Sequence, residues 1–205
     1  MLKIIDHPIV QHGLLVLRDR ETSASEFRRH LKEIAWLLFY EAARELPTSG
    51  ILVETPMEKT TATGLHGKVH LIAVLRAALG MVEGIVAHLQ NADVGHLGLY
   101  RDEQTLQPVQ YYAKLPDLKS GEPTFLVDPM LATGGSMVAA LKILQTRGAD
   151  PLSVLTLIAA PEGVAQVQQF APSVPIFTAA LDRQLNTRGY ILPGLGDAGD
   201  RQFGT

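Results

Sequence analysis

The spacing of apolar residues along the chain predicts alternating strands and helices. Near-continuous apolar runs at Val69–Leu75 and Phe125–Val127 are typical of buried parallel strands, because both faces of such strands are covered. Between Ala24 and Glu45 the apolar residues recur at helical spacing, and Ser23 with Glu26 forms a capping-box pattern at the start. The other predicted elements are strands at 51–54, 94–100, 154–160 and 174–179, and helices at 79–89, 136–147 and 161–170.

This alternation predicts an α/β fold with a doubly wound, mainly parallel sheet, because βαβ units place their strands side by side and parallel. We expect a single domain over residues 1–205, since this length suits one domain. Two polar stretches interrupt the pattern. Residues 57–67 are expected to form a loop or an irregular hairpin, and residues 102–114 a projecting β-hairpin.

Composition narrows the class of protein. Hydrophobic residues make up 46% of the chain and charged residues 19%, as in ordinary globular proteins. The net charge of −3 argues against a nucleic acid as the main partner. The absence of cysteine excludes disulfides, a thiol nucleophile and Cys-ligated zinc. No apolar run is long enough for a membrane span, and the N-terminus lacks a signal-peptide pattern, so we expect a cytoplasmic protein.

The segment Phe125–Ser136 carries the clearest chemistry. A strand ends at Asp128, and residues 133–136 then supply hydroxyls and glycines where a helix begins. The first N–H groups of a helix lack internal partners, and glycine lets a ligand approach the backbone, so this is a candidate phosphate site. The loop lacks the lysine of a Walker A motif, and the preceding acid suits a sugar phosphate. The alternative is an ordinary strand-to-helix turn capped by Thr133.

Two arginines follow predicted strands directly. Arg76 follows the strand at 69–75, and Arg101 follows the strand at 94–100. Ligands of doubly wound sheets bind beyond the carboxyl ends of the strands, so both arginines are expected at the same edge as Asp128. Arginine donates paired hydrogen bonds to oxyanions, which suits a diphosphate. The alternative is that each is a solvated loop residue.

The C-terminal stretch from Gly189 to Gly199 is rich in glycine and too apolar for a disordered tail. Apolar side chains should anchor it, and its glycines free the backbone to approach a flat ligand. The alternative is a terminal segment that wraps the core. The expected anchors are Ile191, Leu192 and Leu195, and the glycines are Gly189, Gly194, Gly196 and Gly199.

The stretch Val127–Ser136 resembles the phosphoribosyl diphosphate loop of the type I phosphoribosyltransferases. Its Asp-Pro pair in place of two acids is similar to the uracil phosphoribosyltransferase family, as is the tail from Gly189 to Asp200 with Phe203–Thr205. The resemblance covers essentially the whole chain. Further matches are His7–Pro8, Leu17–Asp19, Tyr40–Ala42, Val53–Pro56, Leu75–Ala77, Tyr100–Arg101 and Ala160–Gly163.

The resemblance implies that uracil and 5-phospho-α-D-ribose 1-diphosphate react to give UMP and diphosphate, with Arg76, Arg101 and Asp128 as catalytic residues. It implies Mg²⁺ as cofactor, held mainly by substrate and water with no direct protein ligand. The residues implied to bind phosphoribosyl diphosphate are Arg76, Arg101, Asp128, Pro129, Met130, Leu131, Ala132, Thr133, Gly134, Gly135, Ser136 and Asp197. Those implied to bind uracil, within a segment spanning 187–205, are Ile191, Gly196, Asp197 and Ala198.

Backbone groups suit the recognition of uracil, which presents acceptor, donor and acceptor along O2, N3–H and O4. Cytosine carries an amino group in place of O4, so a fixed backbone N–H at that position would oppose another donor. A role for Asp197 in deprotonating N1 of uracil is a further hypothesis. Unchanged turnover in Asp197→Asn would rule it out.

The resemblance also implies a homodimer or a higher homo-oligomer, and it adds GTP as a candidate activator for which the sequence offers no motif. The hairpin at 102–114 is the expected cover of the site, while Tyr111 and Tyr112 suit either that cover or a dimer contact. Two positions depart from the family pattern, which usually has proline at Ala73 and glycine at Ala78. Alanine at 78 is costly only if that position needs a positive φ.

Three alternatives remain beside this interpretation. Another enzyme of the same superfamily would act on a purine or orotate, and the tail argues against it. A nucleotide-sensing regulator without significant turnover would bind RNA or DNA, and the acidic balance argues against it. An inactive homologue is disfavoured by the presence of Arg76, Arg101 and Asp128, while Ala78 is the one residue in its favour.

Overall fold

A computed structural model describes residues 1–89, 91–101 and 108–205. Its centre is an eight-stranded sheet in the order β1-β10-β9-β7-β4-β5-β6, with the short β8 paired beside β9. Every pairing is parallel except the antiparallel β5–β6 pair, so the predicted mainly parallel sheet is confirmed. The strands are β1 (Leu2–Ile4), β4 (Val69–Leu75), β5 (Ala92–Arg101), β6 (Pro108–Lys114), β7 (Ser120–Val127), β8 (Met130–Leu131), β9 (Asp150–Ala159) and β10 (Ile176–Leu181).

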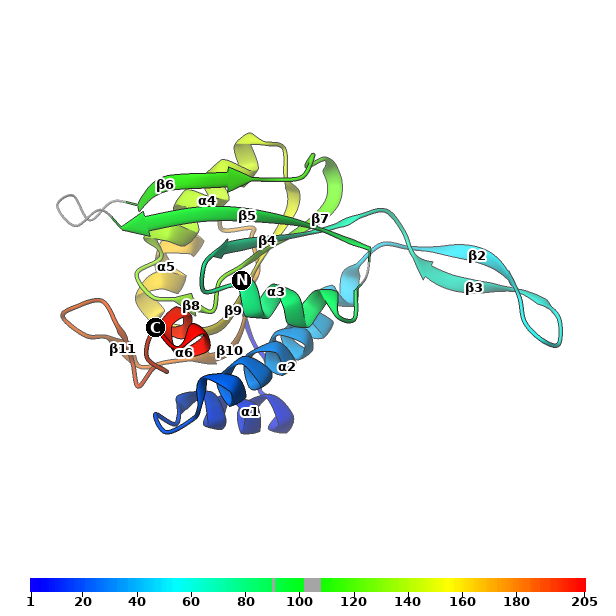
Figure 1. The fold of residues 1–205 in the computed structure, drawn as a ribbon. Helices are drawn as coiled ribbons and strands as arrows, with labels where there is room; N and C mark the ends of the chain where they lie inside the picture. The colour runs from blue at the N-terminus through cyan, green and yellow to red at the C-terminus, as the bar shows by residue number, and fades with distance from the viewer. Residues whose placement is uncertain (90, 102–107) are drawn as a thin grey trace.

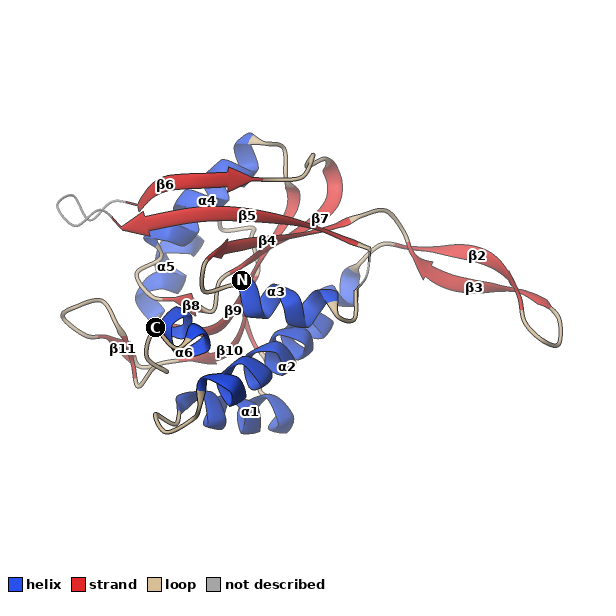
Figure 2. Ribbon diagram, viewed as in Figure 1, coloured by secondary structure: helices blue, strands red, loops and turns tan. Residues whose placement is uncertain are grey.

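Helices cover both faces of the sheet (Figures 1 and 2). The side chains of β4 alternate between two hydrophobic clusters: Leu71 and Ala73 pack with α1, α2 and α3, while Ile72 and Val74 pack with α4 and α5. A period of two along a strand buried on both faces produces this division, and it confirms the doubly wound arrangement. The helices are α1 (Pro8–Arg18), α2 (Ala24–Ala42), α3 (Leu79–Val86), α4 (Gly135–Thr146), α5 (Pro161–Phe170) and α6 (Ala198–Phe203).

At the N-terminus of α2, Ser23 caps the helix as the capping-box pattern predicted, and Glu26 meets its hydroxyl. The Ser23 hydroxyl accepts the N–H of Glu26 at 3.3 Å and donates to the Glu26 carboxylate at 3.1 Å. The helix proper ends at Ala42, and a 3₁₀ turn spans Ala43–Glu45. The predicted extent is therefore right, but its final turn is wound more tightly, as helix ends often are.

The first 22 residues contain two elements that the apolar spacing alone did not predict. The strand β1 pairs with β10, and α1 follows it with Pro8 at its first position. The ring nitrogen Nδ1 of His7 accepts the N–H of Ile9 at 3.2 Å and so caps this helix. Buried side chains at Val10, Leu14 and Leu17 attach α1 to the core.

The strands β2 (Thr48–Glu54) and β3 (Lys59–Leu65) form a two-stranded antiparallel arm that extends away from the sheet (Figure 1). Pairing runs without a register shift from Thr48 opposite Leu65 to Glu54 opposite Lys59. The strand predicted at 51–54 is longer than expected, and the polar stretch after Met57 forms a regular strand and not an irregular one. An isolated hairpin is only marginally stable in water, so the arm needs support from outside itself.

The predicted hairpin at 102–114 is described in part. β6 runs antiparallel to β5, with a register shift between Gly98 and Leu99. The ring of Tyr111 lies over Gly98, where an added Cβ would come within 2.5 Å of it. Residues 102–107, which were predicted to form the rest of this hairpin, lie outside the described residues.

Helices α2 and α3 pack closely at Gly84, and we expect Gly84→Ala to lower the free energy of unfolding. An added Cβ there would lie 2.3 Å from the backbone oxygen of Lys32, so one helix must shift. Overpacking of this kind typically costs about 1–3 kcal/mol. Gly13→Ala in α1 is the matched control, because the nearest atoms to its new methyl belong to side chains and not to backbone: Ile34 at 3.0 Å and Nδ1 of His30 at 3.8 Å. Equal stability of the two variants in urea denaturation would contradict this reading of the helix contact.

Candidate active site

The candidate site lies at the carboxyl edge of the sheet. Val127 pairs with Ala73 of β4, so Asp128, directly after β7, lies beside the end of β4 that leads to Arg76. Leu75 in turn pairs with Gly98 of β5, and Arg101 is the last residue of that strand. The ends of β4, β5 and β7 therefore lie at one edge of the sheet, as predicted. The side chain of Arg101 lies outside the described part of the structure.

The loop before α4 has open backbone donors where the helix begins. Gly134 occupies the N-cap position with φ of 86°, a left-handed conformation that favours glycine, and no side chain caps the helix. The alternative of an ordinary turn capped by Thr133 is therefore wrong. The loop encloses a hollow of about 100 Å³, here called the loop pocket. Its lining residues are Asp128, Met130, Leu131, Ala132, Thr133, Gly134, Ser136 and Met137.

The back of this loop rests on neighbouring secondary structure. β8 adds Met130 and Leu131 to the sheet beside β9, and the N–H of Leu157 donates to the carbonyl of Pro129 at 3.0 Å. At Gly163, in the first turn of α5, an added Cβ would lie 2.4 Å from the carbonyl oxygen of Ala132. The loop backbone is thus held from behind, which leaves the α4 side for a ligand.

The carboxyl group of Asp128, at the carboxyl edge of the sheet, has a strongly shifted pKa. Its Oδ1 accepts the N–H of Met130 at 3.3 Å. The pKa of Asp128 is raised to about 7, mainly because burial disfavours the charged form; the N–H of Met130 lowers it and the nearby charge of Asp197 raises it. The ionised form of Asp128 is unfavourable in the free protein, so a ligand that brings hydroxyl donors or positive charge would stabilise it strongly.

Arg76 contacts the C-terminal helix. Its NH2 nitrogen lies 3.1 Å from Oδ1 of Asp200 and 3.4 Å from the hydroxyl of Thr205, and its guanidinium lies 5.5 Å from the ring centre of Phe203. About half of each side chain of the Arg76–Asp200 pair is exposed. The arginine is therefore accessible to an anion while α6 limits where it points.

Ala78 is compatible with the observed backbone. It has φ of −77° and ψ of −8° at the N-cap of α3, and it is fully buried. The condition under which alanine would be strained there, a positive φ, is not met. Ala73 likewise lies within β4 and is fully buried.

The C-terminal stretch folds into a short hairpin and α6. β11 (Gln184–Leu185) pairs with β12 (Ile191–Leu192), and Asp197 caps α6 by accepting the N–H of Asp200 at 2.9 Å. Ile191 and Leu195 are buried as predicted, and Leu192 is half-buried.

This stretch encloses a second hollow of about 280 Å³, here called the tail pocket. Of the residues predicted to hold a base, Ile191 and Gly196 line it, and Asp197 and Ala198 follow directly in the chain. Its lining residues are Met130, Ala132, Ile158, Gly189, Tyr190, Ile191, Pro193, Gly194, Leu195 and Gly196.

The loop pocket and the tail pocket share Met130 and Ala132 as wall residues. Two ligands held in them would therefore lie side by side. Asp197 directly follows Gly196 of the tail pocket in the chain, and its charge raises the pKa of Asp128 in the loop pocket. The arrangement suits a reaction between a sugar phosphate and a flat, mostly apolar ring.

A larger hollow of about 710 Å³ lies near the opposite, amino ends of β7, β9 and β10. Residues such as Lys3, Arg44, Asp150 and Phe177 line it, and none of the residues predicted for catalysis or binding does. Size alone therefore does not identify the functional site. The converging polar groups of the carboxyl edge make that edge the candidate site.

Metal-binding and membrane features are limited in the described ranges. Within them, no three His, Cys, Asp or Glu residues gather as a ready metal site. None of the helices described is both long enough and apolar enough to cross a membrane.

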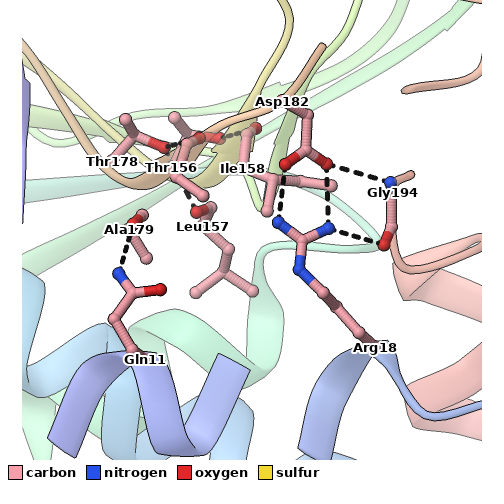
Figure 3. Close-up of polar contacts among 10 residues, drawn as sticks. Gln11, Arg18, Thr156, Leu157, Ile158, Thr178, Ala179, Asp182 and Gly194 are labelled. Atoms are coloured by element: carbon pink, nitrogen blue, oxygen red, sulfur yellow. Dashed lines mark hydrogen bonds and ion pairs between the residues drawn. The ribbon is translucent and has the colours of Figure 1, made fainter. Parts of the chain in front are cut away.

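Several side chains that support the tail were not singled out as site residues by sequence reasoning. Arg18 and Asp182 contact Gly194 (Figure 3), and Arg201 donates to the carbonyl of Leu195 at 2.9 Å. The buried Gln202 of α6 donates to the carbonyl of Ala77, beside Arg76, at 2.6 Å. Only Arg18 had a signal in the sequence, as part of the Leu17–Asp19 match.

Comparison with known proteins decides the family. The family model described as "Uracil phosphoribosyltransferase" matches residues 4–205. The chain belongs to this family. It is 50% identical over 204 residues to the uracil phosphoribosyltransferase of Enterococcus faecalis, covering 99% of this chain and 98% of that protein. It is 52% identical over 205 residues to that of Paracoccus denitrificans, covering 100% and 97%.

Solved structures agree with the observed fold. The AQ2163 protein from Aquifex aeolicus superposes with a TM-score of 0.95 at 36% identity, covering 99% of this chain and 98% of that one. The adenine phosphoribosyl transferase of Trypanosoma brucei, solved with AMP, pyrophosphate and ribose-5-phosphate, has a TM-score of 0.57 at 13% identity, with coverage of 86% and 81%. The second likeness shows the fold alone, a type I phosphoribosyltransferase fold.

Proposed function

We propose that this protein transfers the phosphoribosyl group of 5-phospho-α-D-ribose 1-diphosphate to N1 of uracil, forming UMP and diphosphate. The observation that carries the proposal is the pair of adjoining pockets at the carboxyl edge, one built like a phosphate site and the other lined by an apolar, glycine-rich tail. Family membership supplies the identity of the base. We treat residues 1–205 as one domain, with 187–205 as its base-binding segment.

The sugar phosphate is assigned to the loop pocket. The N–H groups from Ala132 to Ser136, with the hydroxyls of Thr133 and Ser136, would hold the 5′-phosphate. Asp128 would accept hydrogen bonds from the ribose hydroxyls, and its negative charge would stabilise positive charge that grows on the ribose as the C1–O bond breaks. Pro129, Met130 and Leu131 shape the loop from the sheet side.

The departing diphosphate is assigned to Arg76 and Arg101. Negative charge increases on its oxygens as the bond to C1 breaks, and a guanidinium fork donates paired hydrogen bonds to such oxygens. The contact of Arg76 with Asp200 of α6, and its place directly after β4, support this role. The position of Arg101 at the end of β5 supports the same role.

Uracil is assigned to the tail pocket. Backbone groups of Ile191, Gly196 and Ala198 would match its acceptor, donor and acceptor edge, while Asp197 contacts the sugar side. The reaction forms a bond from N1 of uracil to C1 of the ribose and releases the N1 proton. Asp197 is the proposed acceptor of that proton, because it directly follows Gly196 of the tail pocket and its charge acts on Asp128 of the loop pocket.

Magnesium suits the proposed reaction. This ion prefers oxygen ligands and keeps several waters when bound to phosphates, so it would be held mainly by phosphoribosyl diphosphate and water, with no direct protein ligand. When bound to the diphosphate it would neutralise part of the charge of the leaving group. We expect excess EDTA to abolish turnover and added Mg²⁺ to restore it, measured as UMP formation. Full activity in EDTA would contradict a metal requirement.

The test of the proposed function is a spectroscopic assay with phosphoribosyl diphosphate, Mg²⁺ and, separately, uracil, cytosine, orotate and hypoxanthine. We expect UMP from uracil and far slower reaction of the other bases. Faster turnover of another base would assign a different substrate. Binding of nucleotide without product from any base would favour the nucleotide-sensing regulator instead.

A homodimer or a higher homo-oligomer is part of the proposal, and the β2–β3 arm supports it. The arm exposes apolar side chains, including 72% of Leu52 and 53% of Leu65. Such surfaces on a projecting hairpin are typical of contacts with another protein, and a second copy would supply the support that the arm needs. Leu52→Asp, with Thr60→Asp on the opposite face of the same arm as control, tests this by light scattering. An unchanged molar mass for Leu52→Asp would exclude the arm as the contact.

GTP activation, a cytoplasmic location and closure of the hairpin at 102–114 stay predictions from the family resemblance. Titration of the purified protein with GTP during UMP formation tests the first of them. A rate independent of GTP at saturating substrates would remove GTP from the proposal.

A further inference from the structure

The tail pocket depends on the direction in which a few peptide groups point. Gly194 and Gly196 have φ of 68° and 78°, and glycine visits both signs of φ readily. A peptide group next to such residues reverses at low steric cost. The recognition of uracil by backbone groups, on which this inference rests, therefore requires something that prevents the reversal.

The Arg18–Asp182 pair holds both polar groups of Gly194 (Figure 3). The Asp182 oxygen Oδ2 accepts the N–H of Gly194 at 2.9 Å, and NH1 of Arg18 donates to the Gly194 carbonyl at 2.8 Å. The two side chains also bind each other through both oxygens, at 2.9 and 2.6 Å. The two peptide planes that meet at Gly194 are thus fixed together by one bidentate ion pair.

The burial of the Arg18–Asp182 pair suits it to fixing the position of the backbone. The side chain of Asp182 is 3% exposed and that of Arg18 is 25% exposed, and the N–H of Asp182 is anchored to the carbonyl of Ala159 in β9. A buried ion pair adds little net stability, because desolvation offsets much of its attraction. What it supplies is a defined geometry, since a guanidinium fork and a carboxylate meet in one plane.

Arg201 fixes the next peptide plane. Its NH1 donates to the carbonyl of Leu195 at 2.9 Å, and the same guanidinium donates to the backbone oxygens of Leu17 and Asp19 at the end of α1. The C=O and N–H of a trans peptide point in opposite directions, so the N–H of Gly196 points away from Arg201. Gly196 lines the tail pocket.

We propose that Arg18, Asp182 and Arg201 are positioning residues that determine the choice of uracil over cytosine. With the Leu195–Gly196 peptide held, the pocket offers an N–H to the base, which O4 of uracil accepts and the amino group of cytosine does not. If that peptide reversed, the pocket would offer a carbonyl, which matches the amino group of cytosine. None of the three side chains touches the base in this arrangement.

The test is Asp182→Asn, which keeps the shape of the side chain and removes its charge. We expect kcat/KM for uracil to fall about 10–100-fold, KM for phosphoribosyl diphosphate to stay within about twofold, and the inhibition constant of cytosine to fall by about fivefold or more. Asp93→Asn is the matched control, because it breaks a pair with Lys68 (2.7 Å) at the amino end of β5, away from the pocket. All three constants of the control should equal those of the wild type.

Arg18→Lys is the second variant, because it retains the charge and removes the paired fork. Like Asp182→Asn, it should weaken the preference for uracil over cytosine, but by a smaller factor. It therefore still tests the inference if Asp182→Asn does not fold. Lower kcat with an unchanged preference for uracil over cytosine in the folded variants would make the pair merely structural and overturn the inference. Failure of the wild type to use uracil would instead reject the proposed function.

Discussion

Asp128→Asn is expected to reduce kcat while making the free protein harder to unfold at pH 8. The carboxylate is positioned where positive charge grows on the ribose, and loss of one such stabilising group typically costs about 10²–10³-fold in kcat. Its charge is unfavourable in the free protein, because burial has raised its pKa to about 7. Removing it should therefore stabilise the fold by up to about 4 kcal/mol, an upper limit because the residue keeps some contact with solvent.

The pH dependence distinguishes this explanation from a general packing effect. The pKa of Asp128 is higher in the folded than in the unfolded chain, so the folded state binds more protons between these two values. The cost of the charge is present in full above pH 7 and disappears as pH falls through about 7 toward the ordinary carboxyl value. The stability advantage of Asp128→Asn should thus shrink from pH 8 to pH 5 in urea denaturation. A constant advantage, or kcat within about threefold of the wild type, would contradict the assigned role.

The titration of Asp128 also predicts how activity depends on pH, with a region (here called the acid limb) in which activity falls as pH drops. With excess Mg²⁺, kcat/KM for phosphoribosyl diphosphate should fall as pH drops below about 7, because Asp128 becomes protonated. Asp197→Asn removes a neighbouring negative charge and should move the limb to lower pH. A limb that persists unchanged in Asp128→Asn would belong to the phosphate groups of the substrate.

Arg76→Ala is expected to lower kcat/KM for phosphoribosyl diphosphate by about 10²–10³-fold, because the leaving diphosphate loses a charged, forked donor. Stability should change little, since the Arg76–Asp200 pair is about half exposed and such pairs contribute only about 0–1 kcal/mol. Arg76→Lys keeps the positive charge but loses the paired donors of the guanidinium, so its kcat/KM should lie between those of the wild type and Arg76→Ala. Steady-state kinetics at saturating uracil measure all three proteins.

Asp200→Asn is the matched control for this prediction. It removes the partner of Arg76 and leaves the guanidinium in place, so activity should stay within a few-fold of the wild type, about the effect expected of a surface contact. Equal losses in Arg76→Ala and Asp200→Asn would mean that the pair acts by holding α6 and not by binding diphosphate.

The sheet could be predicted from the sequence, because its strands are buried on both faces. Val69–Leu75 and Phe125–Val127 have no polar side of their own, and only a covered parallel strand tolerates that composition. The arm of β2 and β3 could not be predicted in the same way. Its strands are mostly exposed and rich in threonine, so no hydrophobic periodicity marks them.

The loop pocket was predictable because its chemistry is local: an acid, two glycines and hydroxyls lie within one short segment. The order of the tail was predicted from its composition, whereas α6 was too short to give a periodic signal. The Arg18–Asp182 pair had no such local signal, although Arg18 alone belongs to the Leu17–Asp19 family match. Nothing in the spacing of residues relates a helix end to a buried acid near the other end of the chain.

That separation also has a consequence for how the protein acquires activity. Arg18 meets Asp182 across 164 positions and Gly194 across 176. Contacts between such distant parts of a chain close the largest loops, so they form slowly and late compared with helices and neighbouring strands. On the ribosome, α1 must wait for nearly the whole chain to emerge before its last turn meets the tail. Base recognition is therefore completed late, together with the pairing of β1 with β10, which also joins the two ends of the chain, and after the central strands and the phosphate loop already exist.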